Sequence, residues 1–91
     1  MARVMITAQV EDSVKWEKGF RTHGELLRSM SSTVSYFTTT DKNEIAIYAE
    51  PSDLDKYFKV FESPATAAAM AHDGVKRETV KVFVLDREFR Y

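Results

Sequence analysis

The feature that most constrains the fold of this 91-residue chain is the order in which two hydrophobic periodicities follow one another. Residues 3–10 alternate between apolar and polar side chains, which indicates a half-buried strand. Residues 13–30 then carry apolar side chains at helical spacing. Strand patterns return at 33–40, 44–50 and 75–85, and a second helical region from Ser52 to His72 separates the last two. The sequence therefore predicts the order β-α-β-β-α-β.

Residues typical of helix ends and turns support these boundaries. Asp12 or Ser13 can cap the first helix, because a short polar side chain accepts a hydrogen bond from the first turn. Ser63 followed by Pro64 is typical of a helix start and predicts a restart within the second helical region. Gly74 is expected to end that region in a left-handed conformation. The short connection 41–43 predicts that its two flanking strands form an antiparallel hairpin.

This element order predicts a single domain, 1–91, of the α+β class with a ferredoxin-like fold, in which two helices cover one face of a four-stranded antiparallel sheet. We expect Val80, Val82 and Val84 to pack under the helices. The opposite face would then carry several large apolar side chains, although a solvated sheet face is mainly polar. A two-fold homodimer joined through the sheet faces would cover that face. The predicted dimer contacts are Met5, Phe37, Tyr48 and Phe83, and the charged tail 86–91 is expected to reach the partner subunit.

Composition and charge argue against several classes of function. Thirteen basic and 14 acidic residues give a net charge of −1, which provides no long-range attraction for nucleic acid or an anionic membrane. The absence of cysteine removes disulfides, thiolate nucleophiles and cysteine-based metal sites. The first residues lack the pattern of a signal peptide and no apolar run reaches membrane-spanning length, so a cytoplasmic location is expected. Motifs for phosphate loops, serine hydrolases and zinc peptidases are also missing.

His23 is the most unusual residue for its position. It falls within the apolar stripe of the first helical region, between Phe20 and Leu27. One interpretation is a catalytic general base in an apolar pocket. The other is a core histidine that is hydrogen-bonded to a backbone carbonyl or a tyrosine. His72 lies in the last turn of the second helical region, where the exposed backbone carbonyls favour a cation. A metal site that joins the two histidines is not supported, because the sequence shows no spacing typical of metal ligands.

Two of the three glycines, Gly19 and Gly24, lie inside the first helical region, where each costs about 1 kcal/mol relative to alanine. They could make room for a ligand beside Trp16 and His23, or allow a close approach of the second helical region. A third interpretation is that Gly24 ends one helix and Glu25 begins another.

Three features of the chain are those of a known group of proteins: the element order, the aromatic first helix with Trp16 and Phe20, and the segment 58–75 with its Ser63–Pro64 restart. The chain resembles the dimeric α+β barrel proteins and, within them, the small antibiotic-biosynthesis-monooxygenase-like proteins. The resemblance implies a ligand site in the cleft between helices and sheet of each subunit. The residues that would face this cleft are Trp16, Phe20, His23, Phe58, Phe61, Met70 and His72.

The haem-degrading branch of that superfamily has an asparagine on the first strand, a tryptophan on the second helix and a histidine on the helix before the last strand. This chain offers only Thr7 or Gln9, then Tyr57, Phe58 or Phe61, and His72. That departure argues against haem degradation.

Two hypotheses for function follow. The first is a cofactor-independent oxygenase or isomerase acting on a small aromatic or polyketide-like compound, with Trp16 and Phe58 stacking on the substrate while His23 moves a proton. The alternative is a non-catalytic dimeric module for ligand sensing or protein interaction, whose cleft is filled by side chains. An open pocket on the order of 300 Å³ lined by His23 would favour a ligand site.

Overall fold

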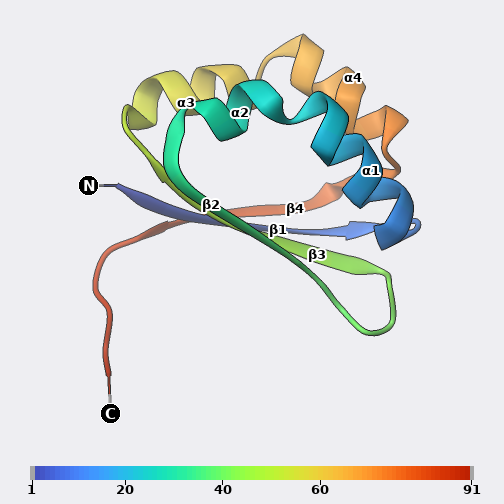
Figure 1. Cartoon of the computed structure of the whole chain (residues 1–91), viewed down its shortest axis with the longest axis horizontal. Helices are drawn as coiled ribbons and strands as arrows, with labels where there is room; N and C mark the ends of the chain where they lie inside the picture. Colours follow the sequence, from blue (N-terminus) through green and yellow to red (C-terminus); the bar gives the residue numbers. More distant parts are fainter. Residues whose placement is uncertain (1, 91) are drawn as a thin grey trace.

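The structure is a computed structural model that describes residues 2–90, apart from the side chains of His23, Leu26 and Leu27. All its helices lie on one face of a four-stranded sheet (Figure 1). The elements are β1 Arg3–Val10, α1 Ser13–His23, α2 Glu25–Ser29, β2 Ser31–Thr38, β3 Glu44–Pro51, α3 Leu54–Phe61, α4 Pro64–His72 and β4 Val75–Leu85. The strands are antiparallel in the order β2-β3-β1-β4. The predicted ferredoxin-like α+β fold is therefore confirmed.

The core lies between the helices and the inner face of the sheet. Every second residue of β1 is buried, as its alternating pattern predicts, and Val4 and Val10 are almost wholly inaccessible. Strand β3 alternates in the same way, and its Ile47 lies opposite Ile6. Trp16 and Tyr57 close the core from the helices, each with 3% of its surface exposed. The two central strands thus position the site that the helices cover.

The first helical region differs from the prediction of a single helix over 13–30. Helix α1 ends at His23, and Gly24 caps it by donating its backbone N–H to the carbonyl of Phe20 at 2.8 Å. A Cβ at Gly24 would lie 2.6 Å from the same carbonyl oxygen, so no larger residue fits without movement. Arg28 of α2 donates to this carbonyl at 2.7 Å and lies over the Phe20 ring. The third interpretation of Gly24, a helix end followed by a new helix at Glu25, is correct.

The predicted caps of the other helix boundaries are present. Asp12 accepts a hydrogen bond from the backbone N–H of Val14 at 2.9 Å. Ser63 caps α4 with Pro64 in its first turn, and Gly74 follows that helix with φ of 78°. Strand β2 begins at Ser31, two residues earlier than expected, because α2 ends at Ser29.

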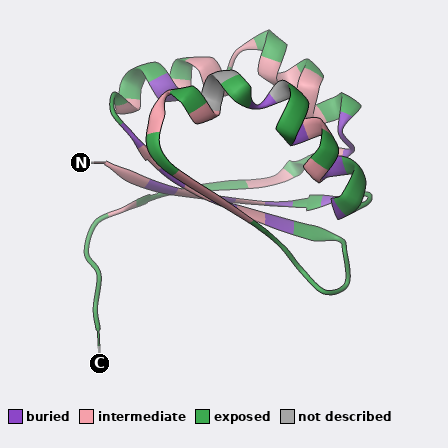
Figure 2. Ribbon diagram, in the orientation of Figure 1, coloured by how far each residue is buried: buried purple, intermediate pink, exposed green. Residues whose placement is uncertain are grey.

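Strand β4 departs from the prediction in its second half. Val80 packs against the core, as expected. Val82 and Val84 share the inner face through their pairing with Ile6 and Val4, yet they are 38% and 57% exposed. The prediction that all three valines pack under the helices is therefore wrong for these two. Strand β4 is an edge strand, and most of its C-terminal half is exposed (Figure 2).

The outer face of the sheet carries the apolar side chains that the alternation predicts. The register places Met5 beside both Tyr48 and Phe83. Phe37 and Phe83 are 58% and 48% exposed. We call Met5, Phe37, Ala46, Tyr48, Phe83 and Leu85 the outer apolar face. Among the described residues, none of the helices has the length and apolar character needed to cross a membrane.

Candidate functional site

A cavity of about 170 Å³ lies between the sheet and the helices. Strands β1, β3 and β4 form its floor, and residues of α1, α3 and α4 form its walls. Most of the lining side chains are apolar. The apolar lining includes Ile6, Ala8, Ile47, Val60, Phe61, Ala69, Met70 and Val80. The cleft is thus open, although smaller than the pocket that the sequence suggested for a ligand site.

An aromatic cluster forms the α1 side of the cavity. Trp16 and Phe20 are one helical turn apart and stack with ring centroids 5.1 Å apart. Tyr36 of β2 meets both rings edge-on, at 5.9 Å from Trp16 and 5.2 Å from Phe20. Edge-to-face and offset-stacked pairs are favourable arrangements of aromatic rings. The three rings therefore hold one another in place and give the cavity a firm wall.

Two hydroxyl groups in the lining serve the local backbone. Ser63 Oγ donates to the carbonyl of Val60 at 2.7 Å, and Thr66 Oγ1 donates to the same carbonyl at 2.6 Å. The backbone N–H of Thr66 donates in turn to Ser63 Oγ. These bonds join the end of α3 to the start of α4, so the two hydroxyls stabilise the helix restart.

Asp73 is the ionisable side chain among the described residues of the cavity lining. Its side chain is only 8% exposed, and it also lines an open hollow on the molecular surface together with Lys15, Lys18 and His72. Oδ1 of Asp73 lies 3.1 Å from Nδ1 of His72, whose side chain is 73% exposed. Asp73 thus lines the cavity, and its carboxylate contacts the exposed imidazole of His72.

Gly19 makes room for that carboxylate. A Cβ built on Gly19 would overlap the Asp73 side chain directly. Of the interpretations given for this glycine, close approach of the second helical region is the one the structure supports, since Asp73 follows α4 directly.

The predicted site residues divide into three groups. Trp16, Phe20, Phe61 and Met70 line the cavity. Phe58 does not line it; its ring packs edge-on against Tyr57 with centroids 6.0 Å apart. His72 does not line it either, because its side chain points to the outer hollow. The side chain of His23 lies outside the described residues, so its predicted role as a base stays a prediction.

Sequence reasoning missed Asp73 as a site residue. The pair Asp73–Gly74 at a helix end has the form of an exposed turn, and nothing in its spacing indicates that the carboxylate is buried. The one available signal was Gly19, whose presence in a helix interior needed a neighbour to explain it. That neighbour, Asp73, lies more than 50 residues after Gly19 in the sequence.

The described residues show no group of three or more histidine, aspartate or glutamate side chains arranged to hold a metal ion. Tyr57 is buried in the core, and this burial raises the pKa of its phenol above the ordinary value. Tyr57 is therefore a neutral core residue at physiological pH.

Comparison with known proteins gives a fold-level answer. No protein-family model matches the sequence, and no curated protein matches it. Among solved structures, an antibiotic biosynthesis monooxygenase superposes with a TM-score of 0.70 at 10% identity, covering 97% of this chain and 99% of the other. The chain has the fold of the antibiotic biosynthesis monooxygenases. The resemblance stated from the sequence is thus confirmed at the level of fold.

Two further structures of this fold come from Streptomyces. A monooxygenase from the gene ActVA-Orf6 of Streptomyces coelicolor, solved in complex with the ligand nanaomycin D, matches at a TM-score of 0.65 and 16% identity over 99% of this chain and 89% of that one. SnoaB, a cofactor-independent oxygenase from Streptomyces nogalater, matches at a TM-score of 0.67 and 12% identity over 98% and 93%.

Proposed function

We propose that this chain binds a small aromatic molecule in the cavity between helices and sheet and acts on it as a cofactor-independent oxygenase. The observation that carries the proposal is the apolar cavity of about 170 Å³ with Trp16 and Phe20 in its wall. A dry apolar cavity of about 150 Å³ is large enough to bind benzene. The expected ligand is therefore a single-ring compound rather than a polycyclic one.

The neighbouring structures support the choice of chemistry, since monooxygenases and a cofactor-independent oxygenase share this fold. In such a reaction the substrate supplies the electrons: a base removes a proton, the electron-rich anion reduces O₂, one oxygen atom enters the substrate and the other leaves as water with two substrate hydrogens. His23 is the proposed base. An isomerase would use the same proton removal without O₂.

The alternative is a non-catalytic module that senses a ligand. One observation favours it: Ser63 and Thr66, two of the polar side chains in the lining, donate their hydroxyl hydrogens to the carbonyl of Val60. Because both hydroxyl hydrogens are held by the backbone, these two side chains are suited to shaping a binding site rather than to moving protons in a reaction.

Ligand binding and oxygen uptake test the proposal in two steps. Benzoate, phenol and hydroquinone are added separately, and the melting temperature of the protein is measured for the wild type and for His23→Ala. We expect at least one compound to raise the melting temperature of the wild type, because a ligand that binds only the native state stabilises it. Equal rises in both proteins would remove His23 from the site.

An oxygen electrode then separates catalysis from binding. Hydroquinone is the probe, and its spontaneous oxidation without protein is subtracted. Oxygen uptake that depends on the protein and is lost in His23→Ala supports the oxygenase. Ligand stabilisation without oxygen uptake would support the sensing module instead.

The proposal also includes a homodimer formed through the outer apolar face. Phe37 and Phe83 are exposed there beside Met5 and Tyr48, and a second copy of the chain offers the same apolar area in return. The rim of this face carries both signs of charge, with Lys81 opposite Thr7 and Glu44 opposite Gln9. In a two-fold contact each patch meets its own copy, so a rim of mixed charge can pair with itself.

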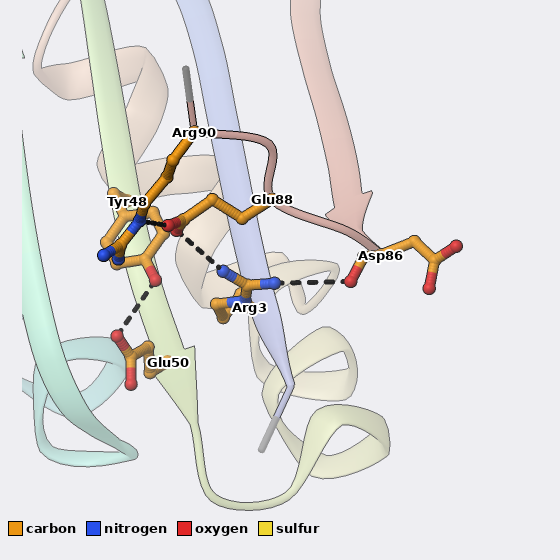
Figure 3. A network of polar contacts seen from close by, with 6 residues as sticks. All are labelled: Arg3, Tyr48, Glu50, Asp86, Glu88 and Arg90. Atoms are coloured by element: carbon orange, nitrogen blue, oxygen red, sulfur yellow. Dashed lines mark hydrogen bonds and ion pairs between the residues drawn. The ribbon is translucent and has the colours of Figure 1, made fainter.

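The tail after β4 lies on the side where that second copy would sit. It leaves the sheet on the face opposite the helices (Figure 1). Arg3 binds it near its start, through the carbonyl of Asp86 and the carboxylate of Glu88, each at 3.3 Å (Figure 3). Phe89 beyond this anchor is 64% exposed. An arm held at its base with an exposed aromatic ring near its end is suited to contact a partner subunit.

A further inference from the structure

The carboxylate of Asp73 is a second polar feature of the cavity, separate from His23. It is buried, and it lies in the wall shared by the inner cavity and the outer hollow. A charged side chain is costly to bury in apolar surroundings unless its interactions compensate. The contact with Nδ1 of His72 is one such interaction.

Two local features make this carboxylate unfavourable for the stability of the fold. Asp73 is the C-cap residue of α4, where the helix dipole disfavours negative charge. Helix α1 must also keep a glycine at position 19, because any side chain there would overlap the carboxylate. Departures from local preferences that meet at one residue are expected where function requires them.

The surroundings of Asp73 link the cavity to solvent. His72 contacts the carboxylate through Nδ1, and most of its ring is exposed. The other charged groups around this position are Asp12, Lys15 and Lys18 on the side of α1, and Glu11, whose side chain packs against Gly74. Among these groups, the imidazole is the one that ordinarily changes charge between pH 5 and 8.

We propose that Asp73 accepts a hydrogen bond from a hydroxyl group on the ligand, and that His72 is a positioning residue that holds the carboxylate through Nδ1. The ligand keeps its proton in this contact, so no covalent bond is broken. This inference rests on the proposed ligand site but does not require the oxygenase reaction.

The test compares probes that differ in one hydrogen-bond donor. Phenol, anisole and toluene have similar size, but only phenol has a hydroxyl hydrogen. Binding is followed at pH 8 by NMR through the backbone amide shifts of Ala69, Met70 and Val80, which line the cavity. Because a hydrogen bond to a charged acceptor is stronger than a neutral one, we expect phenol to bind about tenfold more tightly than anisole or toluene.

Variants assign the discrimination to one carboxylate. Asp73→Asn keeps the shape and removes the charge, so the preference for phenol should fall to about threefold or less, as expected for an ordinary hydrogen bond. Glu62→Gln is the matched control, since Glu62 is also an acidic C-cap residue, that of α3, but is exposed and outside the cavity lining. This variant should retain the full preference.

The pH profile tests His72 in a way that a structural role would not affect. A protonated imidazole shares the charge of the carboxylate, so the preference for phenol over anisole should be smaller at pH 5 than at pH 8. His72→Gln should remove this dependence, and the control Glu62→Gln should keep it. A dependence that persists in His72→Gln would show that His72 does not act on the carboxylate.

The outcomes separate the inference from the proposed function. If none of the three probes shifts the cavity amides, the proposed ligand site itself is wrong. If phenol and toluene bind equally to the wild type, the cavity binds ligands but Asp73 does not accept a hydrogen bond from them. This second comparison uses only the wild-type protein, so it holds even if Asp73→Asn fails to fold.

Discussion

The carboxylate of Asp73 occupies the space that a side chain at position 19 would need, so Gly19 and Asp73 fit together as a pair. Their contact joins α1 to the end of α4. Glycine at position 19 is unfavourable in the interior of α1 because of its low helix propensity. A negative charge at the C-terminus of α4 is unfavourable because of the helix dipole. Neither feature is explained by its own helix, whereas together they place a buried carboxylate in the wall of the cavity.

Gly19→Ala should therefore destabilise the protein although alanine is the better helix former. The gain in helix propensity is about 1 kcal/mol, and forcing an extra methyl group into a packed site costs about 1–3 kcal/mol. We expect the free energy of unfolding to fall by up to about 2 kcal/mol, measured by urea denaturation followed by circular dichroism.

The double variant Gly19→Ala/Asp73→Ala provides the control. If the two residues act as a pair, removal of the carboxylate should make Gly19→Ala neutral or stabilising, which a double-mutant cycle reports as a coupling energy. Strict additivity of the two single changes would contradict the pairing.

Much of the fold follows from local patterns in the sequence. The alternation of Val4, Ile6 and Ala8 sets the inner face of β1, and the same period in β3 sets the face that packs against it. Ser63 and Pro64 mark the start of α4 because capping chemistry is local. Such features can be predicted because each depends on residues that are close in the chain.

The departures arise where specific contacts, rather than hydrophobic periodicity, decide the outcome. Gly24 ends α1 because its backbone and the Arg28 side chain both bond to the Phe20 carbonyl, which periodicity does not report. Val82 and Val84 follow the strand pattern but remain exposed, since burial depends on how far the helices extend over an edge strand. Asp73 is buried through its fit to Gly19, a contact between separate helices.

Filling the cavity should abolish ligand binding without unfolding the protein. Ala69 lies in the cavity lining, and Ala68 is an exposed neighbour on the same helix. Ala69→Leu places an isobutyl group in the cavity, so we expect the rise in melting temperature with phenol to disappear. Ala68→Leu makes the same change outside the lining, and its response to phenol should match the wild type. If Ala69→Leu keeps the full rise, the ligand binds elsewhere.

Alkaline pH should weaken the fold through Tyr57. Burial raises the pKa of this phenol in the folded protein above its unfolded value of about 10. The group binds its proton more tightly when folded, so its contribution to stability is complete below about pH 10 and is lost as the pH rises through the folded pKa. Chemical denaturation between pH 8 and 11 should show a steeper loss of unfolding free energy in the wild type than in Tyr57→Phe. Parallel profiles would show that the phenol does not titrate with unfolding.

The outer apolar face can be tested with two aspartate substitutions at positions of equal exposure. Phe83, on the proposed dimer face, and Val14, on α1 across the molecule, are both 48% exposed. Phe83→Asp places a charge in an interface that two copies would bury, and an unpaired buried charge is strongly unfavourable. We therefore expect it to give a monomer or, if the dimer is needed for folding, insoluble protein. Val14→Asp should leave the molecular mass in light scattering at that of a dimer across a dilution series. A wild type that stays monomeric at every concentration would contradict the proposed interface, whatever the two variants do.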